Sequence, residues 1–358
     1  MHTLTHTPTT TIVTELQGGK LDASARWALY QGLEKLRDEK GAFLAASGPD
    51  YHACWMRDQL YANFAYYYLG EHEKFTAGVK VVFDMLHNAR EKIERATMNP
   101  PVNVYEYIHA KYAHDSLMEM TNDWGHHQVD AVGQFLYVVA FAEQNGVSIL
   151  RTKEDREMLQ LLVAYLSSVK YWEYPDNGMW EEWMELHTSS IGAAVRGLEM
   201  VRDAELAIVP EALIRVGRET LFSILPNETP LREQDLAQLS LMWPYDIVPR
   251  EMADLMLYRI TTKLVQPRGL NRYLDDNYYR SDNGVSAEWT FGFFWLSIVY
   301  HERGARAQSL MWFTRGMRTM TPEGDLPELY QNGRPNPNTP LAWTHALALI
   351  AAKKLELL

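Results

Sequence analysis

Apolar residues recur at three- and four-residue spacing along most of the chain, which is the period of amphipathic α-helices. On this basis we predict helices over residues 21–36, 59–68, 74–93, 128–144, 153–171, 188–201, 211–222, 234–242, 251–263, 286–300, 305–317 and 341–357. Helix-start signals support two of them, since Thr152 precedes the acidic Glu154 and Asp155, and Pro249 precedes Glu251. The pattern therefore predicts an all-α fold of about twelve helices.

The connections between these helices alternate between short turns and long loops. The long loops cover residues 99–127, 172–187, 266–287 and 321–340 and are rich in Trp, Tyr, Asn, Asp, Gly and Pro. No Gly/Ser/Pro-rich linker or composition break divides the chain, so we expect one domain over residues 19–358 after a polar, flexible tail at 1–18. There is no strict repeat, but twelve helices can form six helical hairpins arranged in a ring.

Composition narrows the possible functions. The chain has 47% hydrophobic and 22% charged residues, which is typical of a globular protein, and its formal net charge is -12. An acidic surface repels phosphate backbones, so we expect no nucleic-acid partner. No apolar run is long enough to span a membrane, and the start lacks the basic and apolar segments of a signal peptide. The single cysteine, Cys54, fits a reducing compartment, and we expect a cytoplasmic protein.

Two glutamates in separate long loops are the first candidates for chemistry. Glu181 lies between Trp180 and Glu182, and Glu328 lies in the segment 326–330. Hydrolysis of a glycosidic bond requires two carboxyl groups, one protonated and one ionised. A glutamate beside a tryptophan and a second carboxylate should have a raised pKa. The alternatives are a solvated acidic turn before a helix for Glu181 and a surface carboxylate for Glu328.

Polar and aromatic side chains in other loops are candidates for binding a sugar. Arg57 and Asp58 follow Trp55 at the start of a predicted helix, where they could hold hydroxyl groups; the alternative is an N-terminal helix acid with a solvated arginine. His126 and His127 are adjacent and therefore point in different directions. Because no HExxH or cysteine pair accompanies them, we expect no metal and no cofactor, and the segment is either a polar pocket wall or an ordinary loop.

Taken in order, these segments resemble glycoside hydrolase family 15, the glucoamylase-type family, from about residue 25 to the end. The matching segments are Tyr51, Trp55, Arg57 and Asp58 (Tyr-x-x-x-Trp-x-Arg-Asp), Trp180-Glu181-Glu182, Gly269 to Tyr273 (Gly-x-x-Arg-Tyr), Glu328, and Leu341 to Ala346 (Leu-x-Trp-x-x-Ala). The resemblance implies a single (α/α)6 barrel. It also implies that Glu181 is the general acid, Glu328 the general base and Glu182 a substrate ligand.

The resemblance further implies a set of substrate-binding residues. They are Tyr51, Trp55, Arg57, Asp58, Trp124, Gln128, Trp180, Glu182, Arg272, Trp289 and Trp343. Within this set, Arg57, Asp58 and Arg272 would fix the terminal glucose. Trp124, Gln128, Trp289 and Trp343 would form the walls.

A second resemblance is to the N-terminal barrels of the phosphorylase kinase α and β regulatory subunits, carried by residues 54–58, 109–112, 124–131 and 326–330. Those subunits are regulators. There are also departures from the glucoamylase pattern, because His126-His127 replace an Arg-Pro pair, and Pro327 and Leu329 flank Glu328 in place of Ser and Gln. Trp183 and Glu185 add bulk and charge beside the proposed acid.

Two functions follow from these resemblances. The first is a cofactor-free, exo-acting, inverting α-glucoside hydrolase. Because the sequence shows no starch-binding module, we expect it to act on small α-linked oligosaccharides or disaccharides. The second is a non-catalytic carbohydrate-binding or regulatory barrel.

Overall fold

Five α-helices and one 3-10 helix are buried around most of their circumference, and this decides the architecture. The computed structural model describes residues 19–120 and 126–358. In α10 (Phe291–Glu302) every residue from Phe291 to Val299 is buried, and in α12 (Ala342–Lys354) every residue from Ala342 to Ala352 is buried. A helix without a polar face must be surrounded by other elements. These helices therefore lie on the inside of the fold.

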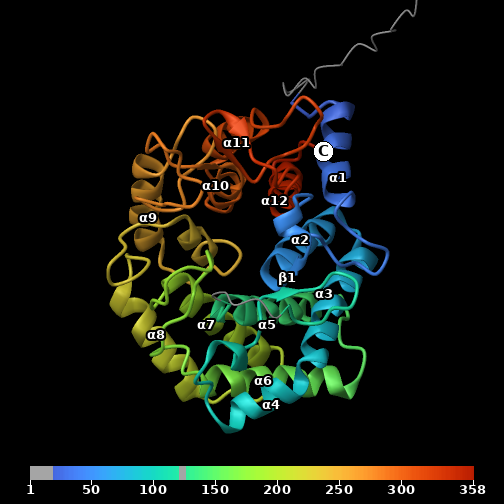
Figure 1. The fold of residues 1–358 in the computed structure, drawn as a ribbon, viewed down its shortest axis with the longest axis vertical. Helices are drawn as coiled ribbons and strands as arrows, with labels where there is room; N and C mark the ends of the chain where they lie inside the picture. The colour runs from blue at the N-terminus through green and yellow to red at the C-terminus, as the bar shows by residue number, and fades with distance from the viewer. Residues whose placement is uncertain (1–18, 121–125) are drawn as a thin grey trace, which may run out of the picture.

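The buried elements form a closed inner ring (Figure 1). Going round the ring, α2 (Met56–Leu69) packs on α5 (Val129–Gln144), and α5 packs on α7 (Thr188–Asp203). Next come the 3-10 helix η3 (Leu236–Leu241), α10 and α12. The ring closes where α12 packs on α2. An outer layer covers this ring with helices that bury one face each. They are α1 (Ala23–Glu34), α3 (His72–Asn88), α6 (Lys153–Ser168), α8 (Glu211–Ile224), α9 (Arg250–Lys263) and α11 (Arg306–Met317).

Inner and outer segments alternate along the chain, so the structure is an (α/α)6 barrel. Over the described residues it contains twelve α-helices, of which α4 (Arg90–Met98) is additional to the two layers, and the short 3-10 helices η1 (Pro49–Tyr51) and η2 (Val104–Glu106). The predicted all-α barrel of about twelve helices is confirmed. Within the same residues, no helix has the length and apolar character needed to cross a membrane.

Three predicted helices differ from the observed elements. Residues 234–242 contain a six-residue 3-10 helix instead of an α-helix, and it begins with a capping box between Asp235 and Gln238. The predicted helix at 74–93 ends at Asn88, and α4 starts at Arg90. The start of the helix predicted at 286–300 is instead strand β3 (Glu288–Trp289). Here pairing with a distant strand overrides local helical periodicity.

Two small sheets join the long loops to one another. Strand β1 (Cys54–Trp55) pairs with β2 (Lys111–Tyr112), and β3 pairs with β4 (Leu329–Gln331), which pairs in turn with β5 (Arg334–Pro335). The register of the second sheet sets Trp289 opposite Leu329. The residue before Leu329 is Glu328, so this pairing fixes a predicted catalytic glutamate beside the start of α10.

Helices α5 and α7 approach each other closely within the inner ring, and this contact depends on glycine. A Cβ atom placed on Gly133 would lie 2.4 Å from the backbone of Ala193 and Ala194, and one placed on Gly197 would lie 2.3 Å from the Gly133 carbonyl oxygen. These neighbours are backbone atoms that no side-chain rotation can move. The two helices could not pack at this distance with any larger residue.

We therefore expect Gly133→Ala to lower the free energy of unfolding by roughly 1–3 kcal/mol, because overpacking forces the backbone of two ring helices apart. Chemical denaturation followed by far-ultraviolet circular dichroism measures the change. Ser167→Ala, at an exposed site on α6, is the control and should have little effect. Equal stability of Gly133→Ala and the wild type would contradict the proposed tight contact.

Candidate active site

A cavity of about 580 Å³ opens where inner helices α2, α10 and α12 begin. The long loops that precede these helices supply most of its walls. The lining residues are Asp50, Tyr51, Trp55, Arg57, Asp58, Lys111, Met179, Trp180, Glu181, Glu182, Arg272, Tyr278, Trp289, Phe291, Glu328, Leu341 and Trp343. Glu181 and Glu328, which are about 150 residues apart in sequence, thus reach the same space.

The loop that carries Glu181 is held in a tight conformation. Its two ends are joined by the antiparallel bridge between Asp176 and Glu185. Inside the loop, the Asn177 side chain donates to the Glu182 carbonyl over 2.7 Å and accepts from the His127 amide. Glu181 itself has a φ of 63°, in the left-handed region that non-glycine residues rarely adopt. The surrounding bonds hold Glu181 in this unfavourable geometry, so its position is imposed by the fold.

Burial gives the Glu181 carboxyl group the character of an acid. Loss of hydration raises its pKa from 4.5 to about 7, opposed by the nearby Arg57 guanidinium and reinforced by the charge of Asp58. The raised pKa expected from the sequence is thus present, with desolvation as its largest cause and with the Asp58 carboxylate as a neighbouring acid that contributes. The carboxyl group can therefore hold or release a proton near neutral pH.

Arg57 connects three parts of the site through its buried guanidinium. One terminal nitrogen donates to Gln128 Oε1 at 2.9 Å and Asp130 Oδ2 at 3.0 Å, and the other donates to Glu181 Oε1 at 3.0 Å. The adjacent Asp58 is also buried, and desolvation raises its pKa to about 6 against the lowering effect of Arg57. The arginine is thus a structural link between α2, α5 and the Glu181 loop.

Glu328 has a different environment from Glu181. Its Oε2 accepts a hydrogen bond of 2.6 Å from Asn336 Nδ2 and one of 2.8 Å from Asn338 Nδ2. Burial raises the pKa of Glu328, while the amide donors of Asn338 and Asn336 and the hydroxyl of Tyr51 oppose the rise. Donors that point at a carboxylate stabilise its ionised form. Burial thus raises the pKa of both candidate carboxyl groups, and what differs is the set of donors, a guanidinium at Glu181 and two amides at Glu328.

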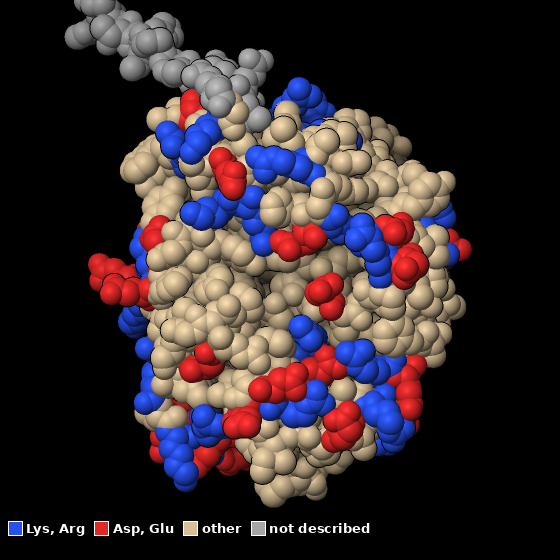
Figure 2. Space-filling view, turned by 180° about the vertical axis from the view of Figure 1, so that it is seen from behind, with Lys and Arg blue, Asp and Glu red and all other residues tan. Residues whose placement is uncertain are grey.

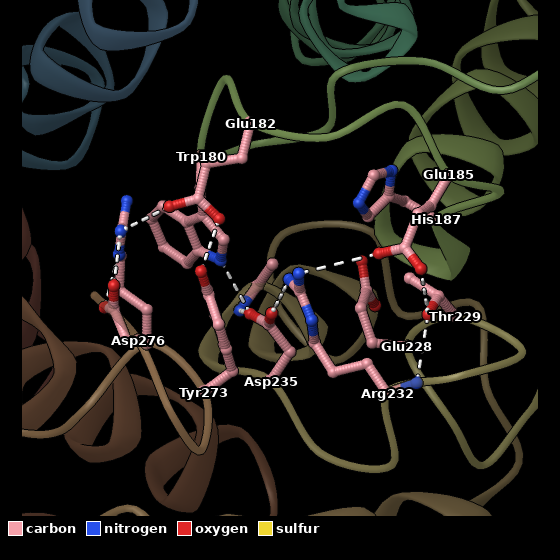
Figure 3. Close-up of polar contacts among 12 residues, drawn as sticks. Trp180, Glu182, Glu185, His187, Glu228, Thr229, Arg232, Asp235, Tyr273 and Asp276 are labelled. Atoms are coloured by element: carbon pink, nitrogen blue, oxygen red, sulfur yellow. Dashed lines mark hydrogen bonds and ion pairs between the residues drawn. The ribbon is translucent and has the colours of Figure 1, made fainter. Parts of the chain in front are cut away.

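Glu182 is held by the loop that carries Arg272. Arg272 donates to Glu182 Oε1 at 2.6 Å, and the Tyr273 hydroxyl donates to Glu182 Oε2 at 2.5 Å. Arg272 also forms two bonds of 2.7 Å with Asp276. Figure 3 shows Glu182 above Tyr273 and Asp276 at this end of the network. The arrangement fixes both charged groups at the cavity wall.

A second part of the network in Figure 3 holds Trp180. Trp180 Nε1 donates to Asp235 Oδ1 at 2.8 Å, and Asp235 also binds Arg232 at 2.8 Å. Arg232 lies 3.5 Å from Glu185, at the far end of the Glu181 loop. Because Asp235 caps η3, the inner ring itself sets the orientation of Trp180.

Aromatic rings form the floor of the cavity. Phe291 stacks on Trp343 with ring centroids 5.0 Å apart, and Trp180 lies 6.1 Å from Phe291 and 6.3 Å from Trp289. Flat apolar faces with a polar edge suit the two sides of a sugar ring. The walls therefore combine aromatic surface with the charged side chains described above.

Most of the predicted site residues come together in this cavity. Those that line it are Tyr51, Trp55, Arg57, Asp58, Trp180, Glu181, Glu182, Arg272, Trp289, Glu328 and Trp343. Gln128 is not among the lining residues; its Oε1 accepts a hydrogen bond from Arg57, and its expected role as a wall stays a prediction. Trp124 lies outside the described residues. The roles assigned to these residues stay predictions.

The sequence interpretation missed several residues of the site. Lys111, Tyr278 and Phe291 line the cavity, and Asn336 and Asn338 bind Glu328. For the two asparagines the sequence held one weak signal. Asn336 and Asn338 are two residues apart, and in extended backbone two such side chains can face the same way and bind one group. Across residues 19–120 and 126–358, no group of three or more His, Cys, Asp or Glu side chains is arranged to hold a metal ion.

Comparison with protein families decides the classification. A family model described as "Glycosyl hydrolases family 15" matches residues 20–207, more than half of the 358 residues. The chain belongs to this family. The match includes the Arg57 segment and the Glu181 loop, and Glu328 lies outside it.

Solved structures have the same fold. A wild-type glycosidase superposes with a TM-score of 0.80 at 20% identity, covering 93% of this chain and 96% of that one. A glycosidase variant in complex with glucose gives a TM-score of 0.79 with the same coverage. The glucoamylase from Saccharomycopsis fibuligera gives 0.68 at 14% identity, covering 93% and 94%. At these identities the likeness establishes the barrel fold.

Curated relatives include regulatory proteins. The α regulatory subunit of phosphorylase b kinase from Oryctolagus cuniculus skeletal muscle is 25% identical over 298 residues, covering 73% of this chain and 24% of the relative. The probable α subunit from Drosophila melanogaster is 27% identical over 272 residues, covering 65% and 21%. The chain thus spans less than a quarter of the length of these two relatives.

The raised pKa of Glu181 gives a prediction about stability. The native carboxyl group keeps its proton up to about pH 7, while the unfolded one loses it near 4.5, so the native state binds more protons between these values. The contribution of this group to the stability of the wild type should therefore fall as pH rises through this window, by at most about 3 kcal/mol. Glu181→Gln cannot ionise, so its stability relative to the wild type should increase from pH 4 to pH 8.

Thermal unfolding at a series of pH values measures this difference. The exposed Glu173 lies in the same loop, and Glu173→Gln is a matched control that should follow the wild-type pH dependence. If the difference between Glu181→Gln and wild type is independent of pH, the carboxyl group does not titrate as we describe.

Proposed function

We propose that this chain is an exo-acting, inverting α-glucoside hydrolase that releases glucose from the non-reducing ends of short α-gluco-oligosaccharides. The main support is that Glu181 and Glu328 reach one cavity from different loops and are hydrogen-bonded by different groups, Arg57 for Glu181 and two asparagine amides for Glu328. Membership of family 15 supports glycoside hydrolysis in general. The substrate, the stereochemistry and the residue roles are part of the proposal.

In the proposed reaction Glu181 is the general acid. With a pKa of about 7, a large fraction of the group carries a proton at neutral pH and can donate it to the glycosidic oxygen as the bond breaks. The carboxylate left behind is then stabilised by the Arg57 guanidinium at 3.0 Å. The same arginine would therefore assist the leaving group by stabilising the product of proton transfer.

Glu328 is the general base in this mechanism. The amides of Asn336 and Asn338 fix the orientation of its carboxylate and favour its charged form. It would take a proton from a water molecule that attacks the anomeric carbon from the opposite face. Inversion requires space for this water, so we expect the two carboxyl groups to lie roughly 6.5–9.5 Å apart.

The shape of the barrel supports action at a chain end. Behind the cavity, Tyr61 stacks on Trp343 at 4.6 Å, and Trp295 packs against both rings. These side chains fill the axis of the ring, so a glucan cannot pass through it. A terminal glucose would enter first and meet Arg57, Asp58 and Arg272, whose donors and acceptors match its hydroxyl groups.

The first test is to incubate the chain with a panel of α-linked disaccharides and to follow the released sugar by proton NMR. We expect early accumulation of β-glucose from at least one linkage, because water attacks opposite to the leaving group. Initial release of α-glucose would indicate a retaining mechanism and would overturn the assignment of Glu328 as a base.

Two variants test the roles of the carboxyl groups. Glu181→Gln and Glu328→Gln should each lower kcat by about 10²- to 10⁴-fold, the usual contribution of general acid–base catalysis, while sugar binding is largely retained. Glucose release measures kcat, and calorimetry measures binding. Glu173 is exposed in the long loop 172–187, and Glu173→Gln should keep wild-type activity. Full activity in either site variant would refute its proposed role.

The second candidate function is a regulatory barrel that binds sugar without cleaving it. The similarity to phosphorylase kinase regulatory subunits favours it. This function predicts that sugars bind to the wild type and that no linkage in the panel is hydrolysed. Tight binding of a sugar without hydrolysis of any linkage would therefore contradict the hydrolase proposal and favour the regulatory function.

A further inference from the structure

A second cavity, of about 380 Å³, lies at the opposite end of the inner ring. Its lining residues are Tyr68, Tyr137, Met242, Trp243, Pro244, Asp246, Val248, Arg250, Ala253, Val299, Glu302, Arg303 and Lys354. Helices α2, α10 and α12 each begin at the candidate active site and end here, because Tyr68, Glu302 and Lys354 are in their last turns. The fourteen residues of α2 span about 21 Å, which sets the separation of the two cavities.

Aromatic side chains close the axis between the two cavities. Trp343 at the first cavity stacks on Tyr61 at 4.6 Å, the Tyr61 ring lies 6.4 Å from Trp243, and Trp243 lies 6.3 Å from Tyr68 at the second cavity. This column of packed rings leaves no open passage along the axis. The second cavity is therefore a separate space and not an extension of the first one.

The walls of the second cavity offer aromatic surface with fixed orientation. The Trp243 ring is packed against Tyr61 and Phe64, and the Tyr137 ring is held by a bond of 2.9 Å from its hydroxyl to the Pro244 carbonyl. Tyr68 is half-buried. Rings fixed in this way lose little conformational entropy when a ligand stacks on them.

The polar side chains of the second cavity mix donors and acceptors. Lys354 donates to Glu302 at 2.5 Å and lies over the Tyr68 ring at 4.4 Å. Asp246 and Arg250 form no ion pair with any described residue. Because carboxylates and cations are interspersed, a ligand with a strong charge of either sign would be repelled by some of these groups. A hydroxyl group can both donate and accept a hydrogen bond, so it could bind to the carboxylates and to the cations.

From this lining we infer that the second cavity is a binding site for a neutral, hydroxyl-rich ring molecule of monosaccharide size. The aromatic walls match the apolar face of such a ring, and the mixed charges match its hydroxyl groups. The volume is near the lower end of the range for small-molecule sites. The inference does not depend on hydrolysis at the first cavity, since the two spaces are separate.

The charges on the face drawn in Figure 2 agree with a local origin for this specificity. Figure 2 shows acidic and basic side chains interspersed over one face of the protein, without a large field of one sign. A ligand would therefore be selected by the groups of the cavity itself and not by long-range attraction. This is the behaviour expected for a neutral ligand.

Isothermal titration calorimetry with glucose tests the inference. We expect two sites per wild-type chain. Asp58→Asn should weaken the site in the first cavity, and Asp246→Asn or Glu302→Gln should each weaken only the second by at least about tenfold, the loss of one hydrogen bond between a charged group and a ligand. Glu219→Gln, at an exposed position on the outer helix α8, is the control for the charge change and should keep both sites.

Three results would overturn the inference. The first is a single glucose site that Asp58→Asn removes and the Asp246 and Glu302 variants leave intact. The second is the absence of glucose binding to a wild type whose folding is verified by circular dichroism. The third is binding of inorganic phosphate that Arg250→Ala abolishes, with no binding of glucose at that cavity, since this would identify an anion site. Loss of turnover alone would refute only the proposed hydrolase.

Discussion

The buried guanidinium of Arg57 is the interaction on which the candidate site depends. A charge removed from water is costly unless it is paired and hydrogen-bonded, and Arg57 is only 3% exposed. Its acceptors are Asp130 in α5, Gln128 immediately before α5, and Glu181 in the long loop 172–187. One side chain at the start of α2 therefore fixes the relative position of three segments, and removing any acceptor would leave a buried charge partly uncompensated.

The barrel supplies the conditions for this interaction. Inner helices that are buried around most of their circumference form a ring with a packed aromatic axis, so the cavities open at the two ends of the ring. At one end the helix starts and the long loops place two carboxyl groups in a cavity. At the other end the helix ends form a second, smaller cavity with a similar mixture of rings and charges. Both sites thus follow from one architectural constraint.

The polar network behind the cavity separates the environments of neighbouring residues. Glu181 and Glu182 are adjacent in sequence, yet Glu182 is bound by Arg272 and Tyr273 while Glu181 is buried beside Arg57. The left-handed backbone at Glu181 directs the two side chains to different partners. This division allows one carboxyl group to keep a raised pKa while the other serves as a fixed wall.

Several elements could be predicted because their signals are local. The helical period identified the inner and outer helices, and the order of the motifs at Arg57, Glu181, Arg272 and Glu328 identified the family. Residues 234–242 and 286–290 were wrongly expected to be α-helical. Their conformation depends on a capping box and on a strand pairing with residues about 40 positions away, which no local period encodes.

The sequence by itself determined the fold class, the family and most of the residues at the cavity, because helical periodicity and ordered motifs are properties of neighbouring positions. Only the tertiary structure decided that Gln128 accepts a hydrogen bond from Arg57, that Asn336 and Asn338 bind Glu328, and that a second cavity exists. These features require segments far apart in sequence to meet. The pKa values of Glu181 and Glu328 are also set by burial and by hydrogen-bond partners. Burial and these partners arise only when the ring closes.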